Sequence, residues 1–206
     1  SFNQPIGDWD TSKVTRMSNM FRDAKSFNQP LKWDTSNVTS MYYMFLATPF
    51  NQPLKWDTSK VIEMSGMFHS TPFNQPLNWD TSKVINIRGM FANATSFNQP
   101  LNWDTSKVTD MGYVFSESKN FNQPLNWNTS NVNDMEFMFS SAKSFNQPLD
   151  WNTSKVTDME RMFGGAISFN QPLNWDTSKV TDMYIMFAGA ISFNQPLNWD
   201  TSKVTN

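Results

Sequence analysis

Residues 169–192 read FNQPLNWDTSKVTDMYIMFAGAIS, and close copies of this unit follow one another through all 206 residues of the chain. The opening tetrapeptide FNQP occurs nine times, at intervals of 25, 23 and 23 residues and then five times at 24. A fixed period of this size is typical of a solenoid, in which each unit buries its apolar face against the next. We therefore expect residues 1–206 to form a single solenoid domain of about nine 24-residue coils. We also interpret the chain as a fragment that lacks both capping units.

The second half of the unit has the apolar pattern of a helix. In residues 176–190 the apolar positions are Val180, Met183, Met186, Phe187 and Ala190, at spacings of 3, 3, 1 and 3. Such spacings place these side chains on one face of a helix. Because a spacing of three also suits a 3₁₀ helix, the pattern predicts either a short α or a short 3₁₀ helix in each coil.

The first half of the unit has the alternation of a strand. The large side chains Phe169, Leu173 and Trp175 all fall in one period-2 phase. Pro172, which has a counterpart in every copy, cannot donate to a sheet ladder. We therefore expect only the Leu-x-Trp part to pair with its neighbours as a short parallel strand. The predicted fold is an α/β solenoid that alternates this strand with the returning helix.

The composition excludes several classes of protein. The formal net charge is only −2, which favours neither nucleic acid nor an anionic membrane as a partner. The chain has no cysteine, so it has no disulfides and no thiolate metal site. No apolar run approaches the roughly 20 residues of a membrane-spanning helix. Nearly every acidic residue belongs to a repeated column, so we expect neither catalysis nor a cofactor or metal.

The consensus FNQPLxWDTSxVTxMxxMFxxAxS resembles the repeats of BspA-like leucine-rich-repeat surface proteins. Its Trp-Asp-Thr-Ser and Met-Phe elements are similar to those of mycoplasma surface lipoproteins, and the resemblance covers the whole chain. It implies a leucine-rich-repeat-like solenoid at the cell surface or outside the cell. The implied role is adhesion to a host or neighbouring-cell surface protein or glycan, with a membrane attachment only through a missing anchor.

Two columns of charged residues are candidate binding surfaces. The acidic column could be a calcium ladder, although the Asp-Thr-Ser sequence favours turn formation or capping. The basic column is interpreted as a solvated face, with an anion-binding strip as the alternative. Asn37 and Asn131 occupy the two positions of this column that lack a lysine. The candidate site residues of the two columns are Asp34, Asp57, Asp80, Asp104, Lys60, Lys83 and Lys107.

Columns of tryptophan, glutamine and asparagine have structural interpretations. Nine Trp residues, from Trp9 to Trp199, form either a buried spine or an exposed binding strip, and burial is favoured because an exposed strip would be a very large apolar patch. Gln29 and Gln52 and their counterparts predict an amide ladder between coils, and Asn28 and its counterparts can join it.

Three functional hypotheses follow. The first is a non-enzymatic interaction module at the cell surface, and the second is a scaffold that self-associates through uncapped ends. The third is recognition of ice or a regular polysaccharide by the threonine array that begins at Thr11, Thr35 and Thr58. The single histidine, His69, occupies a position that varies between copies, so we interpret it as a variable surface residue rather than a catalytic one.

Overall fold

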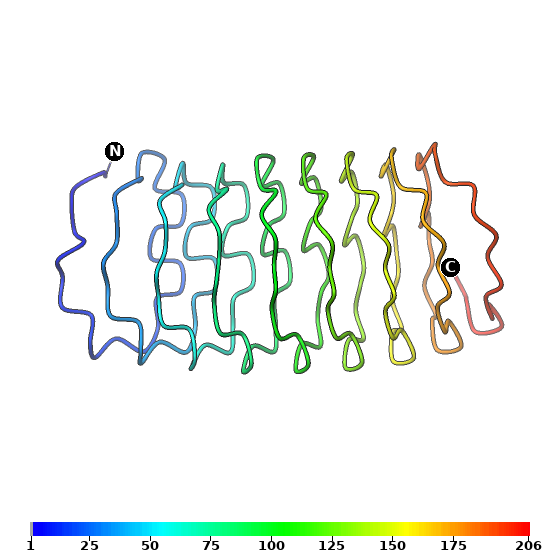
Figure 1. Cartoon of the computed structure of the whole chain (residues 1–206), viewed down its shortest axis with the longest axis horizontal. Coiled ribbons are helices and arrows are strands. Elements are labelled where there is room, and N and C mark those ends of the chain that lie inside the picture. Colours follow the sequence, from blue (N-terminus) through cyan, green and yellow to red (C-terminus); the bar gives the residue numbers. More distant parts are fainter. Residues whose placement is uncertain (1) are drawn as a thin grey trace.

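The chain forms one elongated row of stacked coils. The computed structural model describes residues 2–206, and its two termini lie toward opposite ends of the row (Figure 1). We number the coils by their FNQP starts, so that coil 1 spans residues 2–26, coil 5 residues 97–120 and coil 8 residues 169–192, with half a coil after it. The predicted tandem stacking is therefore confirmed.

The predicted helix is wrong, because the second half of each coil is a run of consecutive turns. We call this half the turn ribbon; it spans residues 15–26 in coil 1 and 109–120 in coil 5. Met17 N donates to Ser40 O at 2.9 Å and Asn19 N to Tyr42 O at 2.8 Å, whereas Met20 N donates back to Met17 O at 3.3 Å. Successive N–H groups thus donate in turn to a carbonyl of the next coil and to a carbonyl of their own coil. No helix that could cross a membrane lies within residues 2–206.

The spacing of the coils explains why turns replace the helix. A helix directs its N–H groups along its own axis and needs a neighbour roughly 8–10 Å away. The turn ribbons instead exchange hydrogen bonds directly, which brings their backbones to the roughly 4.8 Å separation of sheet strands. Two residues per ribbon adopt a positive φ, such as Asn19 and Asp23 at 59°. Each left-handed L-residue costs about 1–2 kcal/mol, and in return both of these residues donate to the next coil.

The parallel pairing lies outside the predicted strand. The structure contains isolated parallel bridges rather than extended strands within residues 2–206, and none of them involves Leu-x-Trp. The bridged residues form one column at the start of the turn ribbons, which we call the bridge column: Arg16, Ser40, Glu63, Asn86, Asp110, Asp134, Asp158 and Asp182. The expected strand-plus-helix coil is thus corrected to an extended segment, a bridge and a turn ribbon.

Side chains take over the cross-coil bonding in the extended FNQPLxW half. Asn51 N donates to Asn28 Oδ1 at 2.9 Å, and Gln52 Nε2 reaches the same oxygen at 3.2 Å. Trp56 Nε1 donates to the carbonyl of Leu31 in the preceding coil at 3.3 Å. The expected amide ladder is therefore confirmed, and it includes asparagine as well as glutamine.

Aromatic rings fill the interior of the solenoid. The last Phe of one coil stacks closely on the first Phe of the next, as Phe139 of coil 6 and Phe145 of coil 7 do at 4.0 Å between centroids. Phe139 also stacks on Phe163 of the next coil at 5.7 Å. The Trp side chains of coils 2–8 are only 5–7% exposed, whereas Trp9, which has a neighbour on one side only, is 55% exposed. The favoured interpretation of the Trp column as a buried spine is confirmed.

Candidate functional site

The predicted acidic column forms turns. Asp34, Asp57, Asp80 and Asp104 are exposed, and each accepts the backbone N–H of the serine two residues later at 2.9 Å. Hydrogen bonds from Ser36 lower the pKa of the Asp34 carboxyl. The turn-forming interpretation is therefore confirmed. Within residues 2–206, no three His, Asp or Glu side chains are grouped closely enough to hold a metal ion.

The predicted basic column faces solvent. Lys60, Lys83 and Lys107 are exposed, and Lys60 Nζ donates to Asn37 Oδ1 of the preceding coil at 2.7 Å. None of the ion pairs formed by residues 2–206 joins this column to the acidic one. The two columns lie at the same turns, but the side chains of opposite charge do not pair. The solvated interpretation fits this arrangement.

The predicted threonine array is not a surface. Thr35 and Thr58 are buried at 2% exposure, and Thr35 Oγ1 donates to the carbonyl of Asp57 in the next coil at 2.8 Å. Thr58 makes the equivalent bond to Asp80 at 2.9 Å. These hydroxyl groups form hydrogen bonds inside the stack and are not exposed to a ligand. The hypothesis that this array recognises ice or a polysaccharide is therefore wrong.

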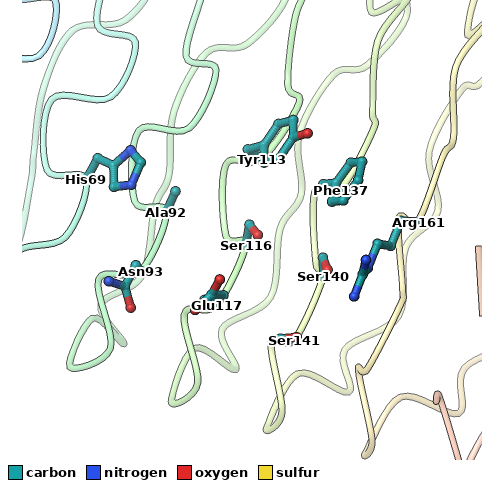
Figure 2. Close-up of a pocket in the computed structure, with 10 residues that line it drawn as sticks. All are labelled: His69, Ala92, Asn93, Tyr113, Ser116, Glu117, Phe137, Ser140, Ser141 and Arg161. Atoms are coloured by element: carbon teal, nitrogen blue, oxygen red, sulfur yellow. The ribbon is translucent and has the colours of Figure 1, made fainter. Parts of the chain in front are cut away.

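A groove on the turn ribbons is the candidate site, because residues from five successive coils line it. It has a volume of about 380 Å³, within the usual range for ligand sites, and it crosses coils 3 to 7 (Figure 2). Its floor consists of small buried side chains, Ala92, Ser116 and Ser140, which each follow the inner Phe of their coil. The same position holds Leu46 in coil 2 and His69 in coil 3. The groove therefore begins where the floor position changes from large to small residues.

A stack of side chains forms one wall of the groove. The Tyr113 and Phe137 rings are parallel, with centroids 4.6 Å apart. The guanidinium of Arg88 covers the outer face of Tyr113 at 4.9 Å, and that of Arg161 lies 5.7 Å from the Phe137 ring. The order Arg–Tyr–Phe–Arg leaves the ring edges, rather than the ring faces, available to a ligand.

The opposite wall is polar. Asn93, Glu117 and Ser141 line it, each at a positive φ between 53° and 58°, and Figure 2 shows them in a row facing the row of Tyr113, Phe137 and Arg161. Only a residue that tolerates this backbone conformation fits, but its side chain is free to vary because it points outward. The two positive-φ positions of each coil thus supply the two walls.

His69 closes one end of the groove. It is half-buried rather than a fully exposed surface residue, and burial lowers the pKa of its imidazole. Beyond it, in coil 2, the Tyr43 ring lies over Gly66, where any Cβ would sit 1.7 Å from Tyr43 Cε1. The aromatic side chain therefore fills the space that remains open farther along the array.

A cluster of ionisable groups borders the aromatic wall. Arg88 Nη1 lies 3.1 Å from Asp134 and 3.4 Å from Asp110, and Nη2 contacts Glu136. Burial and the Asp110 carboxylate raise the pKa of Asp134 to about 6, although a hydrogen bond from the Glu136 N–H and the Arg88 charge oppose this rise. Burial likewise raises the pKa of Asp158 in the next coil. Arg88 thus forms ion pairs with three carboxylates and also packs against the Tyr113 ring.

None of the predicted Asp or Lys residues lines the groove. The repeat consensus concealed the site, because the wall and floor positions are those at which the copies differ. A comparison of the copies position by position, rather than the consensus, carries the available signal: a small residue after Phe in coils 4–8 and aromatic residues at Tyr113 and Phe137.

Comparison with known proteins agrees with the tandem architecture. The profile of a family described as "Mycoplasma protein of unknown function, DUF285" matches residues 1–78, 72–150 and 149–206, so the first two matches each span about three coils. No curated protein and no solved structure matches the chain.

Proposed function

The chain belongs to the DUF285 family of Mycoplasma proteins, and we propose that it is a non-enzymatic binding module whose ligand occupies the groove on the turn ribbons. The observation that carries the proposal is the coincidence of the groove with the variable positions of an otherwise uniform repeat. A scaffold needs its buried columns to stay uniform, whereas a binding site needs distinct side chains at one place. The groove has both a constant frame and a local set of distinct residues.

The chemistry of the groove supports binding rather than catalysis. An activated nucleophile requires a base within hydrogen-bonding reach, itself oriented by a third group. Among the side-chain hydrogen bonds of residues 2–206, those of the groove residues run to neighbouring coils rather than across the groove, from Asn93 to Ser70 at 3.1 Å and from Ser140 to the Gly164 carbonyl at 3.3 Å. Aromatic and Arg side chains beside a small-residue floor are instead typical of binding surfaces.

The resemblance to BspA-like and mycoplasma surface repeats supports a location at the cell surface or outside the cell. The proposed role there is adhesion, with a host or neighbouring-cell surface protein or glycan as the partner. A solenoid with a solvated polar face and a groove that crosses several coils is suited to this role, because its length displays the groove away from other surfaces.

Filling the floor of the groove tests the proposal. Ser116→Leu introduces a residue that the repeat already accepts at Leu46, so the coil has a local precedent for it. We expect the wild-type chain to bind cultured animal cells and S116L to bind at least tenfold less, as measured by flow cytometry of the labelled proteins. Circular dichroism and urea unfolding establish that the variant remains folded.

The matched control changes charges far from the groove. Lys32 and Asp150 are both exposed at the variable position between Leu and Trp, and the double variant K32E/D150K keeps the net charge. We expect it to bind cells as the wild type does. Equal binding by the wild type and S116L would contradict a role for the groove. Absence of binding by all three proteins would favour the self-associating scaffold instead.

A further inference from the structure

The shape and charges of the groove narrow the class of its ligand. Building on the proposed function, we infer that the groove binds an extended peptide segment of a partner protein, with an acidic side chain beside Arg161 and a basic side chain beside Glu117.

The length of the groove suits a short extended peptide. It runs from His69 in coil 3 to Arg161 in coil 7, which is four coil steps. At the sheet-like spacing of about 4.8 Å per step, this distance is roughly 19 Å, and an extended chain rises about 3.3 Å per residue. The groove therefore accommodates roughly six residues.

The aromatic wall is unsuited to stacking with a sugar ring. Both faces of Tyr113 are covered, by Arg88 at 4.9 Å and by Phe137 at 4.6 Å. Phe137 has Tyr113 on one side and Arg161 at 5.7 Å. What remains for a ligand is the ring edges, which carry partial positive charge and attract carbonyl oxygens. A peptide backbone presents a carbonyl at every residue, so it matches this wall better than a saccharide does.

The floor also suits a peptide backbone. Ser116 and Ser140 are small and buried, so a main chain can approach the coil closely. Large ligand side chains have no room there and are directed toward the walls. The residues of the walls, rather than those of the floor, then decide which peptide binds.

The two charged wall residues determine the order in which a ligand must carry its acidic and basic side chains. Arg161 and Glu117 are both exposed, and neither belongs to any of the ion pairs that residues 2–206 form. Measured along the array they are two coil steps apart, about 10 Å, which corresponds to three residues of an extended peptide. His69 at the other end adds no opposing charge at neutral pH, because burial lowers its pKa. A ligand with one acidic and one basic side chain three residues apart is thus complementary.

Two peptides of identical composition test the inference. The probes are Gly-Ser-Lys-Val-Ser-Glu-Ser-Gly and the same peptide with Lys and Glu exchanged, titrated into isotope-labelled protein while the amide signals of residues 113–141 are followed by NMR. An exposed ion pair contributes about 0.2–1 kcal/mol, so two pairs give a preference of roughly twofold to thirtyfold for one order.

The charge-exchanged variant E117K/R161E supplies the decisive comparison. We expect it to invert the preference of the wild type, whereas K32E/D150K keeps the wild-type preference. An unchanged or absent preference in E117K/R161E would overturn the inference. So would a stronger perturbation of the same signals by a β-1,4-linked N-acetylglucosamine tetrasaccharide, since a glycan would then be the occupant.

The outcomes separate this inference from the proposed function. If S116L loses cell binding but the peptides show no order preference, the groove is a binding site for another ligand class. If S116L binds cells as the wild type does, the proposed function itself fails, whatever the peptides do.

Discussion

The two long faces of this solenoid are held together in different ways. On the FNQPLxW face, cross-coil bonds come from side chains that recur in almost every copy, such as the Trp indole and the Asn and Gln amides. On the turn ribbons they come from the backbone, as between Asn19 N and Tyr42 O at 2.8 Å. A face bonded by side chains must keep those side chains, whereas a face bonded by its backbone is free to change them. The candidate groove lies on the face that is free to change.

The interior common to both faces should show the largest effect of a mutation. Phe139 is fully buried and stacks on aromatic rings in the coils on both sides, Phe115 in coil 5 and Phe145 and Phe163 in coil 7. Phe139→Ala removes these contacts and leaves a cavity, so we expect a loss of about 3–5 kcal/mol in the free energy of unfolding. Urea unfolding followed by Trp fluorescence measures it. Ile191→Ala, at an 81% exposed position, should change stability little.

Removing one hydroxyl just after the FNQPLxW segment and one on the turn ribbon compares the two modes of bonding. Thr129 is 1% exposed, and its Oγ1 donates to the Asn152 carbonyl at 2.9 Å. Thr129→Val leaves that carbonyl without the bond, so we expect a loss of about 1–3 kcal/mol in urea. Ser140→Ala on the turn ribbon removes only a 3.3 Å bond to Gly164, whose carbonyl also accepts from the Ser141 N–H. Equal losses for T129V and S140A would contradict the difference between the faces.

Protonation of Asp134, on the turn-ribbon face, should have a smaller effect on the stability of the protein. Its pKa is raised to about 6 by burial and by the Asp110 carboxylate, above the ordinary value of 3.8. Protonation of this carboxyl therefore favours the folded state, and the stabilisation present below about pH 4 is lost as the pH rises through 6. The Asn side chain of Asp134→Asn stays neutral, so we expect the stability of the wild type relative to D134N to fall by about 1–2 kcal/mol between pH 4 and pH 7.5. Parallel urea titrations at the two pH values measure it. If the difference in the free energy of unfolding between the wild type and D134N were the same at both pH values, Arg88 would fully neutralise the Asp134 carboxylate.

Much of the fold was predictable from particular residues. The FNQP period predicted the stacked coils, and the apolar positions from Val180 to Ala190 predicted a one-faced stripe, of which Val180, Met186 and Ala190 are buried. The size of the Trp column predicted its burial, whereas the parallel pairing expected for Leu-x-Trp after Pro172 was wrong. The predictions of burial succeed because burial depends on the size and polarity of each side chain, which the sequence states directly.

The site was not predictable in the same way. Asp34 and Lys60 stood out because they recur, yet they lie at solvated turns. Phe137 and Arg161 each occur once at their position, and nothing in one copy shows that they stack along the array with Tyr113. Their proximity arises only when successive coils lie side by side.

The sequence by itself determined the repeat, the number of coils and the columns that are buried. The tertiary structure decided the path of the backbone, because a spacing of three apolar residues serves a helix and a run of turns equally well. The two differ in where the N–H groups find their acceptors, and those acceptors lie in the neighbouring coil. Packing against that coil therefore selected turns with left-handed residues, and these residues in turn formed the walls of the groove.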